Sequence, residues 1–335
     1  MGIYGGIGVL GTGSHLPDRV RTNEEVAAAC AVSTGWIVER TGVRRRHAAA
    51  AGEATSDLAV AAGGRALSDA ELRPDEIGLL VVATSMPDDF GPSTACRVQV
   101  RLGASRAAAF DLGAACTGFF YALRVAHDWL VATGGGEGYA LVIGAESYSR
   151  FVDPADRATA VLFGDGAAAA VLGPVRPGYG FSEFSWGADG SQADHVLVPA
   201  GGSRRPATGQ TLADGAHYLR MDGRAVAAFI ADVFPRLLAS GVRSGGVKLA
   251  DVDVLISHQP NPALLRRVAE AAGVRPDQLH IIGDRVGNLG AASIAYALAD
   301  AAEQGRLADG SLALLTGFGA GVTWGSVMLR CGGSR

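Results

Sequence analysis

One cysteine has a sequence context suited to nucleophilic chemistry. Cys116 lies where a turn of small residues, 113–115, meets an apolar helical segment, 117–130. A thiol at a helix start lies near the positive end of the helix dipole, which lowers the thiol pKa and favours the reactive thiolate. We therefore predict that Cys116 is a nucleophile able to form a thioester.

The other three cysteines lack this context. Cys30, Cys96 and Cys331 are expected to be small packed side chains. The cysteine spacing is irregular and has no CxxC pair. We therefore predict neither a disulfide framework nor a metal site, and a reducing compartment fits best.

Two further side chains complete a constellation with Cys116. His258 follows an apolar strand-like run, 251–257, and the carboxyl end of a buried strand is a favourable place for catalysis. Asn288 is expected to begin a helix, where the alternative role is an ordinary N-cap. If the three residues converge, the His and Asn nitrogens can both donate to a thioester oxygen and stabilise an enolate.

The elements that position these residues occur twice along the chain. The strand-like run 76–85 corresponds to 251–259, and the turn and helix 113–123 correspond to 287–298. The later matches pair the strands 139–147 and 311–319 and the glycine-rich hairpins 163–173 and 318–329. Such a pattern predicts an α/β protein built from two duplicated halves, 1–173 and 174–335. The Ala- and Gly-rich helices would pack back to back between the sheets, and 174–222 would hold surface loops.

Composition narrows the functional class. The chain has 335 residues, 48% of them hydrophobic, which suffices for a large core. The net charge of −4 gives no support for nucleic-acid binding. The first residues do not resemble a signal peptide, and we expect no apolar run long enough to span a bilayer. We expect a soluble, cytoplasmic protein with no membrane partner.

The glycine pattern at residues 6–11 matches GxGxxG, the dinucleotide-binding fingerprint. In that fingerprint the glycines follow a strand and open a helix. Here almost no chain precedes them and a polar, proline-containing segment follows, so we interpret residues 6–11 as part of a first strand.

The ordered motifs resemble one known family over nearly the whole chain. They are GTGSHLP at 11–17, WIVERTG at 36–42, AACTGF at 114–119, DPADRATAVLFGDGAAAAVL at 153–172, HQPN at 258–261, GNLGAAS at 287–293 and FGAGVTWG at 318–325. The chain resembles the ketoacyl-acyl-carrier-protein synthases of type III, in the thiolase superfamily. That resemblance implies a five-layered αβαβα fold and a homodimer.

The resemblance also assigns roles. Cys116 would accept the acyl group from acyl-CoA, which is a substrate, with no cofactor or metal implied. His258 and Asn288 would assist decarboxylation of a malonyl thioester carried on CoA or on an acyl carrier protein. The remaining assignments are the backbone of Cys116 and Ala320 as an oxyanion hole, Trp36 and Arg157 around the CoA adenine, Arg40 near the nucleotide phosphates, and Asn261 along the pantetheine tunnel.

Some family positions differ here. A basic position used for carrier-protein docking is Ala263, and an aromatic–basic pair is Ala227 and Ala228. The aromatic that closes the acyl pocket corresponds to Gly91, unless Phe90 takes its role. These differences make a specialised primer or acceptor plausible, such as one in polyketide biosynthesis.

The implied reaction is a decarboxylative Claisen condensation in fatty-acid or polyketide biosynthesis. The alternative is an acyltransferase of the same fold that passes the acyl group to an alcohol or amine, although such relatives often have Asp at the Asn288 position. A non-catalytic partner subunit would lack Cys116. A cysteine protease is disfavoured because the C-G-S-C-W context of papain-like enzymes is missing.

Overall fold

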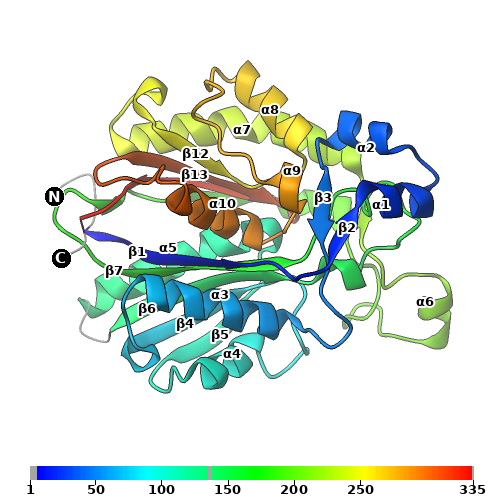
Figure 1. Cartoon of the computed structure of the whole chain (residues 1–335), viewed down its shortest axis with the longest axis horizontal. Helices are drawn as coiled ribbons and strands as arrows, with labels where there is room; N and C mark the ends of the chain where they lie inside the picture. Colours follow the sequence, from blue (N-terminus) through cyan, green and yellow to red (C-terminus); the bar gives the residue numbers. More distant parts are fainter. Residues whose placement is uncertain (1–5, 135–137, 334–335) are drawn as a thin grey trace.

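The computed structural model describes residues 6–134 and 138–333. Two sheets alternate with three layers of helices, which gives the predicted five-layered αβαβα arrangement (Figure 1). The expected thiolase-like α/β fold is thereby confirmed. The further expectation of a domain boundary at residue 173 stays a prediction.

The first sheet has the strand order β1-β7-β6-β4-β5. Its strands are β1 (Ile7–His15), β4 (Ile77–Ala83), β5 (Ala108–Leu112), β6 (Tyr139–Glu146) and β7 (Gly166–Pro174). β4 is parallel to its neighbours β5 and β6, while β7 runs antiparallel to β6 and β1. β1 contains most of the GxGxxG segment, so this motif lies in a strand, as predicted.

The second sheet repeats this arrangement. Its strands are β8 (Gly180–Phe181), β9 (Ser185–Ala188), β12 (Val254–Ser257), β13 (Leu312–Gly319) and β14 (Thr323–Arg330). β12 is parallel to β13, and β14 is antiparallel to β13, as β4, β6 and β7 are in the first sheet. The strand pairing therefore follows the sequence repeat.

Two helices form the central layer between the sheets (Figure 1): α5 (Gly118–Thr133) and α10 (Ala292–Glu303). Small residues permit close packing here. A Cβ at Gly144 would lie 2.7 Å from the carbonyl oxygen of Ala291. β6 can therefore approach the start of α10 this closely only because residue 144 is glycine. This close approach brings the loops at both helix starts to the middle of the molecule.

The outer layers cover the remaining sheet faces. α3 (Thr55–Asp69) and α4 (Thr94–Leu102) lie on the first sheet, and α7 (Gly223–Gly245) and α8 (Pro262–Ala271) are on the side of the second. By length and composition α7 could cross a membrane, which the sequence analysis did not anticipate. Its apolar face packs against β13 and β14 through residues such as Phe234 and Leu237, as a core helix does.

Short elements complete the fold. They are β2 (Val20–Thr22), α1 (Asn23–Cys30), α2 (Thr34–Thr41), β3 (Arg45–His47), β10 (Val196–Leu197), α6 (Gly209–Ala213), β11 (Arg220–Met221) and α9 (Gly283–Val286). Single 3-10 segments are η1 (Pro74–Glu76), η2 (Ala115–Thr117), η3 (Tyr148–Arg150), η4 (Gly190–His195) and η5 (Leu249–Asp251). The segment 174–222 is mostly loops, as expected, but β8 and β9 extend the second sheet by pairing with β14.

Candidate active site

A cavity of about 560 Å³ gathers most of the residues singled out from the sequence. Those that line it are Cys116, His258, Asn288, Ala320, Trp36, Arg40, Arg157 and Asn261. Both halves of the chain therefore contribute to one site. Phe90 and Gly91 are not part of this lining.

Cys116 lies in η2, directly before α5, as its sequence context predicted. The Cys116 side chain is partly exposed, because it lines the cavity, but protein atoms surround most of the thiol. Burial raises the pKa of Cys116 to about 12, and the charge of Glu146 adds to this effect. The backbone N–H groups of Cys116 and Ala320 favour the thiolate but act more weakly. The expected low pKa of Cys116 is therefore wrong, because desolvation of the thiolate anion dominates.

His258 follows β12 at the carboxyl end of that strand, as predicted, and only 2% of its surface is exposed. Its backbone N–H donates to the carbonyl of Thr316 on the neighbouring β13, at 3.0 Å. Burial lowers the pKa of His258 to about 3, so the imidazole is neutral at physiological pH. A neutral imidazole can donate one hydrogen bond without bringing a charge into the cavity.

Asn288 lies in the turn 287–291 between α9 and α10. The expectation that it begins the helix is wrong, because α10 starts only at Ala292. The backbone of Asn288 is held on both sides: its N–H donates to the Leu162 carbonyl at 2.8 Å, and its carbonyl accepts the Gly164 N–H at 3.0 Å. Its Oδ1 accepts the Gly290 N–H at 2.8 Å. The amide oxygen is thereby occupied, which leaves the Nδ2 group as the donor for a ligand.

Ala320 lies in the turn that joins β13 to β14, beside Cys116. A Cβ on the preceding Gly319 would approach the backbone nitrogen of Cys116 to 3.0 Å, so the two backbones are in close contact. Thr323 links them further, because its hydroxyl bonds that of Thr117 at 2.9 Å and donates to the Ala320 carbonyl at 3.1 Å. Two backbone N–H groups that converge at one sulfur form a geometry suited to an oxyanion.

One aromatic and two cationic side chains lie together in the lining of the cavity. The guanidinium of Arg157 lies 5.9 Å from the ring centroid of Trp36, and Arg40 follows one turn later on α2. The Nδ2 group of Asn261 donates to the Arg40 carbonyl at 3.1 Å, and its Oδ1 caps α8 by accepting the Leu264 N–H at 2.9 Å. Asn261 thus joins α2, the helix that carries Trp36 and Arg40, to α8.

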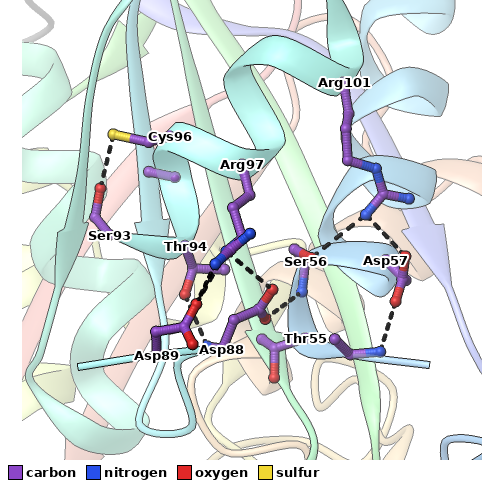
Figure 2. A network of polar contacts seen from close by, with 12 residues as sticks. Thr55, Ser56, Asp57, Asp88, Asp89, Ser93, Thr94, Cys96, Arg97 and Arg101 are labelled. Carbon is purple, nitrogen blue, oxygen red and sulfur yellow. Dashed lines mark hydrogen bonds and ion pairs between the residues drawn. The ribbon is translucent and has the colours of Figure 1, made fainter. Parts of the chain in front are cut away.

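Phe90 and Gly91 form the tip of the loop between β4 and α4. Figure 2 shows the polar contacts at its base: Arg97 pairs with Asp89 at 2.5 Å, and Asp88 accepts the Ser56 N–H at 3.0 Å. The tip has no such contacts, since Phe90 is 94% exposed and a Cβ at Gly91 would meet nothing within 4 Å. The base of the loop is therefore anchored, whereas its aromatic side chain points away from the rest of its own chain.

Sequence reasoning missed two features of the site. Phe318 packs against the His258 ring, and Glu146 is a fully buried carboxylate close enough to influence Cys116. The FGAG and IGAE segments gave no chemical pattern that would have identified them. Within the described residues, no group of three His, Cys, Asp or Glu side chains is placed to hold a metal ion.

Comparisons with known proteins show the family of the chain. Models of the 3-oxoacyl-[acyl-carrier-protein] synthase III family match residues 110–190, and models of its C-terminal part match residues 242–331. The chain is 42% identical to a beta-ketoacyl-[acyl-carrier-protein] synthase III from Desulfitobacterium hafniense over 324 residues, which is 97% of each chain. It is 43% identical to an acetoacetyl CoA synthase from Streptomyces sp. over 316 residues, covering 94% of this chain and 95% of that one.

Solved structures give the same result. The synthase III of Thermus thermophilus superimposes with a TM-score of 0.89 at 37% identity, covering 98% of this chain and all of the other. A priming beta-ketosynthase from a polyketide pathway also gives 0.89, at 32% identity and with 98% and 97% coverage. This protein belongs to the 3-oxoacyl-[acyl-carrier-protein] synthase III family and is a condensing enzyme of fatty-acid or polyketide biosynthesis.

Proposed function

We propose that Cys116 takes an acyl group from acyl-CoA and that the acyl-enzyme then condenses with a malonyl thioester. The observation that carries this proposal is the meeting of Cys116, His258 and Asn288 in one cavity, although they come from distant parts of the chain. No cofactor is required, because acyl-CoA is a substrate and the chemistry needs only a nucleophile and hydrogen-bond donors.

In the first step the Cys116 sulfur attacks the acyl carbonyl. The C–S bond to CoA breaks, and the proton lost from Cys116 leaves with the CoA thiol. The negative oxygen of the tetrahedral intermediate is held by the N–H groups of Cys116 and Ala320, and the contact of both groups with the Cys116 sulfur supports this role. Because the pKa of Cys116 is raised to about 12, this stabilisation must act during attack rather than through a pre-formed thiolate.

In the second step the malonyl thioester loses CO₂, and the electron pair of the broken C–C bond forms an enolate. His258 Nε2–H and Asn288 Nδ2–H donate to the enolate oxygen. The enolate carbon then attacks the acyl thioester, forming the new C–C bond and releasing the Cys116 thiolate, which regains a proton. Neutral His258 suits this role, because a donor that remains neutral adds no charge to desolvate.

The rim of the cavity supports CoA as the acyl donor. Trp36 and Arg157 present an aromatic face and a cation that can enclose an adenine, and Arg40 offers a charge to phosphates. Two further cations, Arg266 and Arg267, are exposed on α8, a few residues after Asn261 in the sequence. Either CoA or an acyl carrier protein can present the malonyl group in this proposal, since Ala263, Ala227 and Ala228 remove the family's usual carrier contacts.

We further propose that the enzyme is a cytoplasmic homodimer. β5 is the last strand at one edge of the first sheet, and Phe110 on it is 38% exposed. Val100 on α4 and Phe90 on the adjacent loop are 72% and 94% exposed. A second copy would cover these apolar groups and bring its Phe90–Gly91 loop towards the first copy's acyl-binding region.

Intact-protein mass spectrometry after incubation with a panel of acyl-CoAs tests the proposal. The native enzyme and Cys96→Ala, which removes the exposed cysteine, should both gain an acyl mass, whereas Cys116→Ala should not. A thioester-linked acyl group on Cys116→Ala would refute the nucleophile. If the acyl-enzyme never releases CO₂ from malonyl thioesters but transfers its acyl group to an alcohol or amine, the protein is the alternative acyltransferase instead.

A further inference from the structure

A buried acid lies beside the site and takes no part in the reaction described above. Glu146 is the last residue of β6 and is fully buried. Its Oε1 accepts the N–H groups of Ala291 and Ser85, both at 3.1 Å. Its Oε2 lies 3.1 Å from the Ser85 nitrogen and 3.4 Å from the Thr84 hydroxyl. One carboxyl group thus connects the end of β4 to the start of α10, across the two sequence repeats.

The same carboxyl group supports the turn that carries Asn288. Ala291, whose N–H bonds Glu146, ends this turn, and Gly290 within it orients the Asn288 amide by donating to Oδ1. The packing is tight: a Cβ at Gly290 would lie 2.9 Å from Glu146 Oε1 and 2.3 Å from the Tyr148 ring. A shift of the carboxyl group would therefore move the turn and redirect the Asn288 Nδ2 group.

The surroundings of Glu146 favour its neutral form. Burial raises the pKa of Glu146 to about 8, although the N–H groups of Ala291 and Ser85 and the Ser85 and Thr84 hydroxyls oppose this. The titratable groups that face it are Cys116, from the start of α5, and Tyr148, from η3; burial raises the pKa of both, and the Glu146 charge raises each further. Among the described residues, no lysine, arginine or histidine forms an ion pair with it.

The hydrogen-bond pattern is compatible with a protonated acid. Oε1 keeps both N–H donors, while a proton on Oε2 can be donated to the Thr84 oxygen, because a hydroxyl both donates and accepts. Glutamine reproduces this pattern, with its oxygen at Oε1 and its NH₂ group facing Thr84. Ionisation, in contrast, creates a buried negative charge that acts electrostatically on the Cys116 thiol, and like charges oppose one another most strongly where water is excluded.

We propose that Glu146 is a positioning residue whose protonated carboxyl group holds the 287–291 turn so that Asn288 faces the cavity, and whose ionisation slows condensation. This inference rests on the role proposed above for Asn288. It explains why an acid, rather than an apolar residue, lies between the two central loops: the N–H groups of Ser85 and Ala291 need an acceptor there.

The experiment compares Glu146→Gln and Glu146→Ala with the native enzyme between pH 6 and 9.5. Cys116 acylation is followed by mass spectrometry and condensation by release of CO₂ and product. Native condensation should decline above about pH 8, and Glu146→Gln should keep near-native activity at pH 7 while losing that decline. Glu146→Ala should lower condensation by about tenfold or more at pH 7, because a misplaced donor is ineffective, and acylation should fall much less.

Asp165→Asn is the matched control, since Asp165 is another fully buried acid that accepts backbone N–H groups, from Ala49 and Ser149. It should retain the native alkaline decline. The same decline in Glu146→Gln would overturn the proposal, as would a Glu146→Ala enzyme that condenses at the native rate. If Glu146→Ala does not fold, the pH profile of the isosteric Gln variant still decides.

A second readout does not depend on condensation. Alkylation of Cys116 by iodoacetamide should be equally fast in the native enzyme and Glu146→Gln at pH 6.5, but severalfold faster in the variant above pH 8, where only the native enzyme has the opposing charge. Equal rates above pH 8 would refute the electrostatic effect. A native enzyme that is acylated but never condenses would instead contradict the proposed function, so the two failures are distinguishable.

Discussion

The ring of His258 stands nearly perpendicular to the ring of Phe318, with 5.4 Å between centroids and 74° between planes. Phe318 is 1% exposed and His258 2%, so neither ring has room to turn. His258 Nδ1 is enclosed and has no hydrogen-bond partner among the described residues. The contact therefore fixes the imidazole with Nε2 as the nitrogen available to a ligand, and burial keeps it neutral.

A neutral His258 predicts an unusual pH dependence. Because its pKa is lowered to about 3, malonyl decarboxylation should show no step near the ordinary histidine pKa of about 6.5. The neutral form is favoured by folding, so this contribution to stability is present above about pH 6.5 and is lost as the pH falls towards 3. Decarboxylation rates of the native enzyme and His258→Gln between pH 5 and 7.5 measure the first effect. Urea unfolding of both proteins at pH 4.5 and 7 measures the second. A rate step near pH 6.5 that His258→Gln removes would contradict the assignment.

Loss of either enolate donor should slow condensation. His258→Ala and Asn288→Ala should each reduce malonyl decarboxylation on the order of 10²–10³-fold, since such a donor acts on charge that appears only in the transition state. Acylation of Cys116 should fall less, because its oxyanion donors are backbone groups. His127→Ala, a half-buried histidine on α5 that does not line the cavity, should leave both steps unchanged. Native decarboxylation rates in both variants would refute the mechanism.

Arg157 should contribute to recognition of the CoA nucleotide. A cation beside an aromatic ring contributes roughly 0.5–2 kcal/mol, so Arg157→Ala should raise the KM for acyl-CoA about two- to thirtyfold with little change in kcat. The matched control is Arg176→Ala, because Arg176 lies 4.9 Å from the Tyr179 ring outside the cavity. A short acyl thioester without adenine should not distinguish the two variants. If Arg157→Ala raised the KM for the thioester without adenine as much as the KM for acyl-CoA, Arg157 would not act by binding the adenine.

The loop glycine predicts a primer larger than acetyl. In the proposed homodimer Gly91 would offer the second copy no side chain to close its acyl pocket, and each additional buried CH₂ contributes about 0.8 kcal/mol. Four more carbons would then favour a longer primer by roughly 3 kcal/mol before ordering costs. In competition between acetyl-CoA and a medium-chain or branched acyl-CoA, the longer group should dominate the Cys116 adduct, and Gly91→Phe should shift the adduct towards acetyl.

The matched control for Gly91→Phe is Gly52→Phe, because Gly52 lies in another loop where a Cβ would meet nothing within 4 Å. That variant should keep the native primer preference. Dominant acetylation of the native enzyme would show that Phe90, or another side chain, closes the pocket.

Much of the fold followed from sequence because the pattern is local and repeated. The apolar run that became β4 and the small residues before α5 each have a counterpart in the second half, and the two sheets pair their strands in the same way. The residue types Cys116, His258 and Asn288 carry their own chemistry, and each lies beside a strand end or helix start that periodicity can locate. The sequence alone therefore determined the fold class, and it predicted the nucleophile and its two partners.

Only the tertiary structure decided how these groups behave. The pKa of Cys116 is high because residues from β6 and the β13–β14 turn exclude water from it, and no local pattern records that exclusion. Asn288 lies ahead of α10 because its turn is bonded to Leu162 and Gly164, more than 120 residues away along the chain. The role of Glu146 could be inferred only from the structure, because its partners Ser85 and Ala291 follow β4 and precede α10. Residue type and periodicity are properties of neighbouring residues, whereas desolvation and hydrogen-bond partners depend on atoms that folding alone brings together.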